Sequence, residues 1–379
     1  IHSSVILIAI SYKSLCYFCH KDNYSNMTIE KGIAAFTSLG KFLSQFNPEG
    51  EKLSALDVIN EQYYDSFHKN INQAIIYNGW FNKEFVRKAI EKISNGLNEE
   101  SLSNWINDYP VNYENPKKIL VIMAGNIPLV GFHDFISVLL SGNTFVGKCS
   151  EQDNKLLPMI AEILAFMEPE FKERIAFVSG RDKNFDAVIA TGSNNSARYF
   201  EHYFAKNPNI IRKNRTSIAV LDGSETKEDL DGLSDDICTY YGLGCRNVSK
   251  IYLPKSYDLD KIFNALYKYQ GLIENKKYGN NYDYHKAIYL MNLHSILENG
   301  FMILKEDKEL HAPVSVVFYE FYEDLKEVNT FISENADKLQ CIVSKIPEID
   351  GLPFGKAQSP GWKDYADNVD TIDFLTRID

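Results

Sequence analysis

From residue 117 onward the sequence alternates short, almost continuous apolar runs with segments of helical periodicity. The apolar runs are KKILVIMAG, NTFVGK, RIAFVSG, DAVIATGS and SIAVLDG, and the segments between them include PLVGFHDFISVLLSG and NKLLPMIAEILAFM. Strands that are apolar along their whole length and are separated by helices are typical of a parallel sheet covered on both faces. The sequence therefore predicts an α/β fold built on a doubly wound, mostly parallel sheet.

A second cycle of the same kind begins near residue 227. KEDLDGLSDDICTYYGLG, LDKIFNALYKYQGLI, YHKAIYLMNLHSIL and LKEVNTFISENADK have helical character, and SKIYLP, FMILKE, VSVVFYEFY and QCIVS have strand character. Residues 27 to about 107 are mostly helical in pattern, as in NKEFVRKAIEKISNGL, where apolar residues recur at helical spacing. We expect a helical N-terminal segment followed by two stacked α/β domains with a site between them.

The first 26 residues differ from the rest. The chain starts with Ile1, and MTIEKGIAAFTSLGKFLSQF from Met27 has the pattern of a fresh amphipathic start. We expect the natural chain to begin at Met27, with residues 1–26 a non-native or disordered leader. The leader contains CYFCH at residues 16–20, which matches the c-type haem attachment pattern. Haem attachment requires export, and we see no signal peptide in this stretch, so no haem is assigned.

Charge and cysteine content argue against several classes of partner. The formal net charge is −11, and an acidic surface argues against binding to nucleic acid or to an anionic membrane. No apolar run approaches the roughly 20 residues that span a bilayer. Six cysteines in 379 residues indicate reduced thiols and a cytoplasmic protein, since a disulfide framework needs a denser pattern. The cysteines and histidines show no metal-ligand spacing, so we expect no metal site.

Two polar stretches follow strand-like runs, where open α/β sheets bind their ligands. In VIMAGNIPLV the Asn126 amide can donate to a developing oxyanion, or it can form an Asx turn that caps the next helix. In ATGSNN, Thr191, Gly192 and Ser193 suit a pyrophosphate at a helix N-terminus, although a plain helix cap has the same pattern. GNTFVGKC at 142–149 is not a phosphate-binding loop, because a helix precedes its first glycine and a cysteine replaces the magnesium-binding hydroxyl.

Cys245 lies in YYGLGCRNVSKIYLP, between a helical and a strand-like segment. A free cysteine is usually a buried small hydrophobe. Here Gly242 and Gly244 allow the backbone to approach a ligand closely, and the adjacent Arg246 favours the thiolate. From this stretch alone both interpretations, core residue and catalytic nucleophile, stay open.

Taken in order, these motifs resemble the aldehyde dehydrogenase superfamily, and within it the acyl-CoA reductases of the bacterial luminescence type (LuxC). The similarity extends from about Met27 to the C-terminus. It rests on the order of AGNIPLVGFHDFISVLLSGNTFVGKCSEQ, TGSNNSARYFEHYFA, GLGCRNVSKIYLP, KELHAPVSVV and SPGWKDYADNVDT. The resemblance implies an aldehyde dehydrogenase-like fold with two stacked α/β domains. The implied parts are a helical segment at 27–115, a Rossmann-like NAD(P)-binding domain at 116–236, a catalytic thiol domain at 237–345, and a C-terminal return at 346–379 that packs on the cofactor domain.

The resemblance also implies roles for individual residues. Cys245 is the nucleophile, and Asn126 contributes to the oxyanion hole. The implied cofactor-binding residues are Lys148 and Glu151 at the adenosine ribose, Thr191, Gly192 and Ser193 beside the phosphates, and Glu309 at the nicotinamide ribose. The family's habit favours NADPH, whereas Glu151 would repel a 2′-phosphate and leaves NADH open as the reductant.

One departure from the superfamily is informative. Hydrolytic aldehyde dehydrogenases carry a water-activating glutamate just before the strand equivalent to SIAVLDG, and here Arg212 stands in its place within IIRKNRTS. A positioned base contributes about 10²- to 10⁴-fold to a rate, so hydrolysis of an acyl-enzyme should be slow. The resemblance therefore implies NAD(P)H-dependent reduction of a long-chain fatty acyl-CoA to the aldehyde through a Cys245 thioester.

Three other functions stay open beside this one. They are reduction of an acyl phosphate, oxidation of an aldehyde, and binding without catalysis by an inactive paralogue. Among partners we expect a small acyl-CoA substrate and no nucleic acid. A homo-oligomer is left open, because the segment before residue 117 has little room for the hairpin that often builds the superfamily's oligomers.

Overall fold

The computed structural model describes residues 27–180 and 184–378. The expected leader, with its CYFCH motif at 16–20, lies outside the described residues. Four helices open the described chain, as the periodicity predicted. They are α1 (Ile29–Ser44), α2 (Asp57–Tyr77), α3 (Lys83–Gly96) and α4 (Glu99–Ile106). The side chains of Thr28, Asn82 and Asn98 cap α1, α3 and α4 by accepting a backbone N–H three residues ahead.

The first sheet has five parallel strands in the order β3-β2-β1-β4-β5. Its strands are β1 (Lys118–Ile122), β2 (Thr144–Lys148), β3 (Ile175–Phe177), β4 (Ala187–Thr191) and β5 (Asn209–Arg212). The connecting helices are α5 (Phe132–Leu140), α6 (Leu156–Met167) and α7 (Asn194–Tyr203). The chain winds from β1 to β3 in one direction and continues from β4 to β5 in the other. The direction thus reverses between β1 and β4, which is where sheets of this kind bind ligands.

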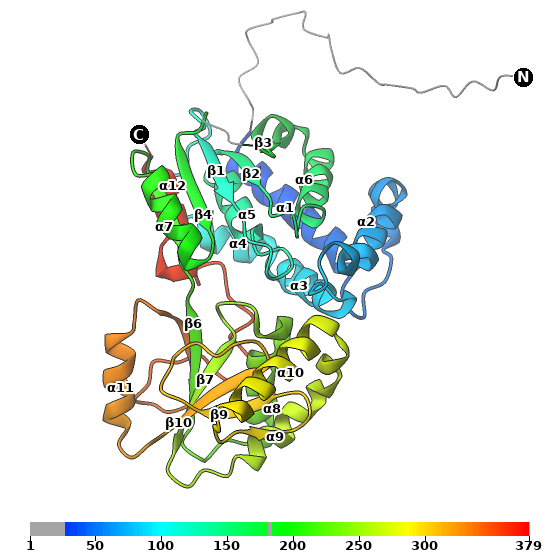
Figure 1. Ribbon diagram of the computed structural model, residues 1–379. Coiled ribbons are helices and arrows are strands. Elements are labelled where there is room, and N and C mark those ends of the chain that lie inside the picture. Colours follow the sequence, from blue (N-terminus) through cyan, green and yellow to red (C-terminus); the bar gives the residue numbers. More distant parts are fainter. Residues whose placement is uncertain (1–26, 181–183, 379) are drawn as a thin grey trace, which may run out of the picture.

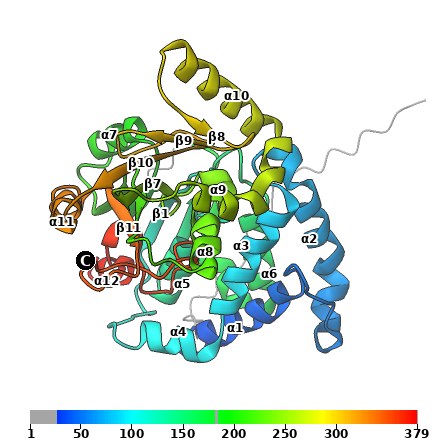
Figure 2. The same ribbon diagram turned by 90° about the horizontal axis from the view of Figure 1, so that it is seen from below.

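The second sheet has the order β11-β6-β7-β10-β9-β8 and is parallel except at the β8–β9 edge. Its strands are β6 (Thr216–Val220), β7 (Val248–Pro254), β8 (Leu297–Glu298), β9 (Ile303–Glu306), β10 (Val316–Tyr322) and β11 (Leu339–Val343). Its helices are α8 (Lys227–Cys238), α9 (Asp260–Leu266), α10 (Lys276–Met291) and α11 (Leu325–Glu334). Figure 1 shows this sheet below the first one, and Figure 2 shows α10 reaching outward beside β8 and β9.

The described residues also form five 3-10 helices, the last of which lies in the C-terminal return. They are η1 (Ser54–Leu56), η2 (Pro169–Arg174), η3 (Thr239–Gly242), η4 (Tyr267–Glu274) and η5 (Ala366–Asn368). None of the helices in the described part of the chain is long and apolar enough to cross a bilayer.

The two-sheet architecture agrees with the prediction, but several boundaries differ. β6 and α8 belong to the second sheet and its covering helices, so the sheets divide the chain at residues 213–215 and not at 236. Strand periodicity cannot reveal this, because a buried parallel strand has the same apolar pattern in either sheet. β5 was missed because it is short and is flanked by polar residues. α5 begins at Phe132, later than expected, since Leu129 takes a left-handed backbone conformation with φ 58°.

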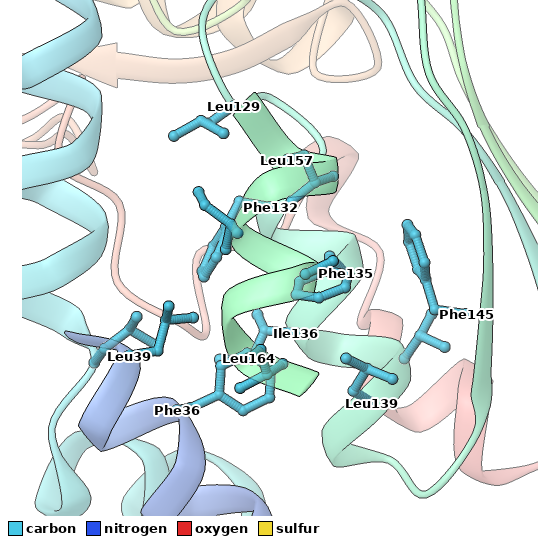
Figure 3. Packing of buried hydrophobic residues seen from close by; sticks show 14 of the residues in the cluster. Phe36, Leu39, Leu129, Phe132, Phe135, Ile136, Leu139, Phe145, Leu157 and Leu164 are labelled. Atoms are coloured by element: carbon cyan, nitrogen blue, oxygen red, sulfur yellow. The ribbon is translucent and has the colours of Figure 1, made fainter. Parts of the chain in front are cut away.

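The core of the first domain lies between its sheet and the N-terminal helices. Figure 3 shows Phe132, Phe135 and Leu139 of α5 packed among residues of α1, α6 and β2. The α3 helix serves both domains. Its Val86 and Ile90 belong to this first core, whereas Phe85 and Ala89, on the adjacent face, belong to the core of the second domain. Two apolar faces on one helix therefore fix the two sheets relative to each other.

The C-terminal return runs from the second sheet to the first. Its Leu352 forms a parallel bridge with Val343 at the end of β11. The buried Asp236 carboxylate then accepts the backbone N–H groups of Gly355 at 2.6 Å and Ala357 at 3.0 Å. The last helix, α12 (Thr371–Thr376), packs on α5 in the first domain.

Candidate active site

The carboxyl ends of the first sheet face the start of β7 in the second sheet. Because the five strands are parallel, their carboxyl ends share one edge. Asn126 follows β1, Lys148 ends β2, Thr191 ends β4 and Arg212 ends β5. Residues from four separate motifs are thereby gathered on the side of the sheet that meets Cys245.

Cys245 lies on a loop that we call the thiol loop, residues 239–247, between α8 and β7. Of the four cysteines that the structure describes, Cys238 is buried, Cys149 and Cys341 are half-buried, and Cys245 is exposed. A free cysteine normally avoids solvent. The exposure of Cys245 therefore removes the interpretation of this residue as a simple core hydrophobe.

Asn126 contacts the thiol loop directly. Its Nδ2 donates to the backbone oxygen of Leu243 at 2.9 Å, two residues before Cys245. The Asx cap that the sequence left open is not observed, since the N-cap of α5 is Gly131 and no side chain caps this helix. On the other side, Asn78 Nδ2 donates to the Gly125 oxygen at 2.9 Å and holds the loop that carries Asn126. The bond to Leu243 engages one N–H of the Asn126 amide.

The electrostatic surroundings of Cys245 combine opposing effects. Displacement of water by the surrounding protein raises the pKa of the thiol above its ordinary value, and the nearby Arg246 and Arg212 guanidinium groups lower it. The Asp367 carboxylate acts in the opposite direction and raises the pKa of Cys245. The resting thiol is therefore mostly protonated near neutral pH, and the two arginines stabilise the thiolate when it forms.

Arg212 is held by a buried ion pair. Its guanidinium donates to Asp134 through two bonds, Nη1 to Oδ2 at 2.5 Å and Nη2 to Oδ1 at 2.8 Å, and Nη2 also donates to Thr371 Oγ1 at 3.1 Å. The side chains are 8% and 5% exposed. The pair fixes a cation at the end of β5. No carboxylate at position 212 is therefore available to activate water.

The expected cofactor residues lie at the ends of β2 and β4. Lys148 is half-buried and Glu151, three residues further on, is exposed. Thr191 and Gly192 are half-buried, and Ser193 is the N-cap of α7, where its Oγ accepts the Ser196 N–H at 3.3 Å. These residues lie near the β1–β4 reversal point, and the N-terminus of a helix such as α7 is a general binding position for anions. A Cβ on Gly192 would lie 2.8 Å from Ser196 Cβ, so this turn needs glycine.

Glu309 belongs to the crossover between β9 and β10. Its backbone N–H donates to Asp307 Oδ1 at 3.0 Å, and its side chain is exposed. Ser249 Oγ, at the start of β7, donates to the Leu310 oxygen at 3.0 Å. This contact holds the crossover near the start of β7, the strand that follows Cys245.

A pocket of about 580 Å³ lies beside the thiol loop, and its walls come from α3, α4, the start of α5 and residues 360–364. Most wall residues are apolar or aromatic, among them Ile93, Trp105, Leu129, Val130, Phe132 and Trp362. The rings of Trp105 and Trp362 stack with centroids 5.1 Å apart. Arg246 Nη2 donates to the Asp364 oxygen at 3.0 Å, which joins the pocket wall to the thiol loop. Such a pocket suits an apolar ligand.

Sequence reasoning missed several residues that shape the site. They are Asp134, Ser217, Asn247, Cys341 and Asp367. Ser217 Oγ donates to the Cys245 oxygen at 2.9 Å and lies 3.0 Å from Cys341 Sγ. A signal existed for Asp134, because a carboxylate inside the apolar run FHDFISVLL must be paired when buried. For the others, polar residues near strand ends have no distinguishing local pattern.

Comparison with a protein-family model gives a direct match. The model described as acyl-CoA reductase (LuxC) matches residues 25–268, which include both Asn126 and Cys245. A curated relative, the long-chain acyl-protein thioester reductase of Aliivibrio fischeri, is 23% identical over 258 residues. That match covers 58% of this chain and 52% of the relative, so the chain spans about half the relative's length.

Solved structures of aldehyde dehydrogenases share the fold. Aldehyde dehydrogenase 21 from Physcomitrella patens, in complex with the reaction product succinate, aligns with a TM-score of 0.62 at 13% identity and covers 88% of this chain and 79% of that one. A Mycobacterium tuberculosis aldehyde dehydrogenase complexed with NAD⁺ aligns with a TM-score of 0.56 at 14% identity and covers 85% and 74%. The expected aldehyde dehydrogenase-like fold is confirmed.

Proposed function

The chain belongs to the acyl-CoA reductase (LuxC) family, and we propose that it reduces a long-chain fatty acyl-CoA to the aldehyde through a thioester on Cys245. One observation carries the proposal. An exposed cysteine and an asparagine amide meet on the thiol loop, while the strand end that faces them carries a paired arginine. A nucleophile, an oxyanion donor and an arginine in place of a carboxylate at position 212 together favour reduction over hydrolysis.

The first step is acyl transfer to the protein. The Cys245 thiolate attacks the thioester carbonyl, the carbon–sulfur bond to coenzyme A breaks, and coenzyme A leaves as the thiol. The Asn126 amide and the backbone N–H of Cys245 would hold the oxygen of the tetrahedral intermediate. Arg246 and Arg212 lower the pKa of the thiol and so increase the fraction of thiolate.

The second step takes the acyl group from thioester to aldehyde. A reduced nicotinamide, when bound, supplies the hydride. The same two donors then hold the oxygen of the thiohemiacetal on Cys245, which collapses to free aldehyde and regenerates the thiol. Arg212, bound to Asp134, cannot accept a proton from water, so the acyl group is kept for reduction.

The pocket beside the thiol loop supports a fatty acyl chain. When an acyl chain binds between its aromatic and aliphatic walls, apolar surface of the chain is removed from water. This burial stabilises the complex by about 25 cal/mol per Å² of buried area. For the acyl carrier we propose coenzyme A, in line with the family's description. The name of the curated relative adds a protein-bound acyl thioester as the second candidate.

For the reductant we propose NADPH with NADH as the competitor. Lys148 and Glu151 would hold the adenosine ribose, Thr191, Gly192 and Ser193 the phosphates, and Glu309 the nicotinamide ribose. The fit rests on the β1–β4 reversal point and on the N-terminus of α7, whose N–H groups suit a pyrophosphate. The M. tuberculosis structure with NAD⁺ supports a nicotinamide cofactor for this fold. Glu151 would repel a 2′-phosphate and favours NADH.

The test follows the oxidation of NADPH and of NADH with acyl-CoAs of graded length, an acyl phosphate and an acylated carrier protein. With a free aldehyde it follows the reverse signal, the reduction of NADP⁺ and of NAD⁺. Wild type is compared with Cys245→Ala and with Cys238→Ala, which removes a buried thiol outside the site. We expect turnover with long acyl-CoAs, its loss in Cys245→Ala, and its retention in Cys238→Ala. Unchanged turnover in Cys245→Ala would remove the nucleophile, and turnover with the aldehyde alone would replace reduction by oxidation.

A further inference from the structure

The thiol loop has an unusual backbone. Tyr240, Tyr241 and Gly242 are three consecutive residues in the left-handed region, with φ of 56°, 60° and 74°. For residues other than glycine this conformation is costly, and two such residues in succession persist only where the surroundings hold them. Packing explains part of this, since both tyrosine rings pack against Phe85 of α3. Asn247, at the other end of the loop, holds the backbone on both sides of these left-handed residues.

Asn247 is 2% exposed and uses its whole amide. Its Nδ2 lies within hydrogen-bond distance of three backbone oxygens, those of Asp236 at 3.0 Å, Ile237 at 3.2 Å and Thr239 at 2.9 Å. Its Oδ1 accepts the N–H of Gly244 at 2.8 Å. One side chain thus satisfies the free carbonyl groups at the end of α8 and also holds the residue before Cys245.

Both proposed oxyanion donors depend on this contact. The segment between Thr239 and Gly244 carries Leu243, whose oxygen holds the Asn126 amide at 2.9 Å. The next residue after Gly244 is Cys245, whose N–H is the second donor. Asn247 touches neither donor, but it fixes the backbone on which both are positioned.

We propose that Asn247 is a positioning residue that holds the thiol loop so that the Asn126 amide and the Cys245 N–H converge on one oxyanion. This inference rests on the proposed function, in which Cys245 accepts an acyl group. It assigns Asn247 to acyl transfer and not to the reactivity of the thiol itself. The two can be separated, because alkylation of a thiol needs no oxyanion donor and acylation does.

The experiment measures two rates on Cys245 in the full chain without cofactor. One is the burst of p-nitrophenolate released by p-nitrophenyl acetate, which reports acyl transfer. The other is alkylation by iodoacetamide, followed by mass spectrometry of the Cys245 peptide. In Asn247→Ala we expect acyl transfer to fall about 10- to 100-fold, as a displacement near 1 Å implies, while alkylation changes less than about 3-fold.

Two further variants make the outcome decisive. Gly244→Ala places a Cβ 3.0 Å from Asn247 Oδ1 and so disturbs the same contact at the half-buried residue 244. If Asn247→Ala fails to fold, this variant should show the same selective fall in acyl transfer. Asn335→Ala is the matched control, since Asn335 Nδ2 donates to the Phe331 oxygen at 2.9 Å at the end of α11 in the same domain. Both rates should be unchanged in Asn335→Ala.

The inference is overturned if the acyl-transfer and alkylation rates fall together, or if Asn247→Ala and Gly244→Ala acylate as fast as Asn335→Ala. It is also overturned if the wild type shows no burst, since no acyl group then reaches Cys245. A normal burst without oxidation of NADPH or NADH on any thioester would instead contradict the proposed reductase activity and leave the role of Asn247 standing.

Discussion

The buried pair of Arg212 and Asp134 makes a quantitative prediction about stability. Replacing one partner of a buried pair leaves an uncompensated charge and costs about 3–5 kcal/mol. Asp134→Asn keeps the shape of the side chain but leaves Arg212, 8% exposed, with one oxygen of the new amide and Thr371 as acceptors. We therefore expect Asp134→Asn to lower the free energy of unfolding by about 4 kcal/mol.

The double variant tests the reasoning. The double variant Arg212→Met with Asp134→Leu removes both charges of the pair. Its loss of stability should be far smaller than the sum of the losses in Arg212→Met and in Asp134→Leu, because apolar replacement of a buried pair is often nearly neutral. The assay is equilibrium unfolding in urea followed by circular dichroism at constant pH and salt. Asp108→Asn is the control, since the Asp108–Lys363 pair is exposed, and its effect should stay within about 0.5 kcal/mol. Additive single losses, or a loss in Asp134→Asn no larger than in the control, would refute the assignment.

Three more predictions follow from single groups. Burial raises the pKa of Asp153 to about 7 from an ordinary value of 3.8, so the folded protein loses stability as pH rises between these values. The melting temperature of Asp153→Asn should therefore exceed that of the wild type at pH 8 and should equal it near pH 4. Equal melting temperatures at pH 8 would contradict this. A Cβ at Gly96 would lie 3.0 Å from the Trp362 ring, so Gly96→Ala should shift that wall of the pocket and change the ratio of kcat/KM for long over short acyl-CoAs; an unchanged ratio would exclude this wall from chain recognition. Displaced water raises the pKa of Cys245 above its ordinary value of 9.0, so alkylation of the free protein should still rise above pH 9, and a plateau at neutral pH would show a preformed thiolate.

Much of the fold followed from periodicity. Apolar runs such as KILVI and AVIAT indicated buried strands, and the apolar spacing in NKEFVRKAIEKISNGL indicated the helix α3. The sheet to which a strand belongs did not follow, because β6 has the apolar pattern of either sheet. The left-handed Leu129, which delays α5, is held by the distant Asp153 carboxylate at 3.1 Å and has no local signal.

The candidate site was predictable where chemistry needs a rare residue in a fixed context. The motifs predicted Cys245 and Asn126 as candidates, and the contact of Asn126 with the thiol loop was visible only in three dimensions. Asn247 stands two residues after Cys245, yet nothing in GCRNV distinguishes a buried amide from a solvated one. Its role depends on free carbonyl groups at the end of α8, which come together with it only when the chain closes.

The path of the C-terminal return also bears on how the chain folds during synthesis. Ile372 and Leu375 of α12 belong to the core of the first domain, and the Leu375 oxygen accepts a hydrogen bond from Asn143 at 3.1 Å. The last strand of the first sheet ends at Arg212, so this sheet cannot complete its core until the whole second sheet and α12 have left the ribosome. The second sheet can pair all its strands once β11 has left the ribosome, shortly before α12, apart from the contacts of residues 346–357. A nascent chain of this protein should thus carry an exposed apolar face on α5 for most of its elongation, which makes it a natural client for a chaperone.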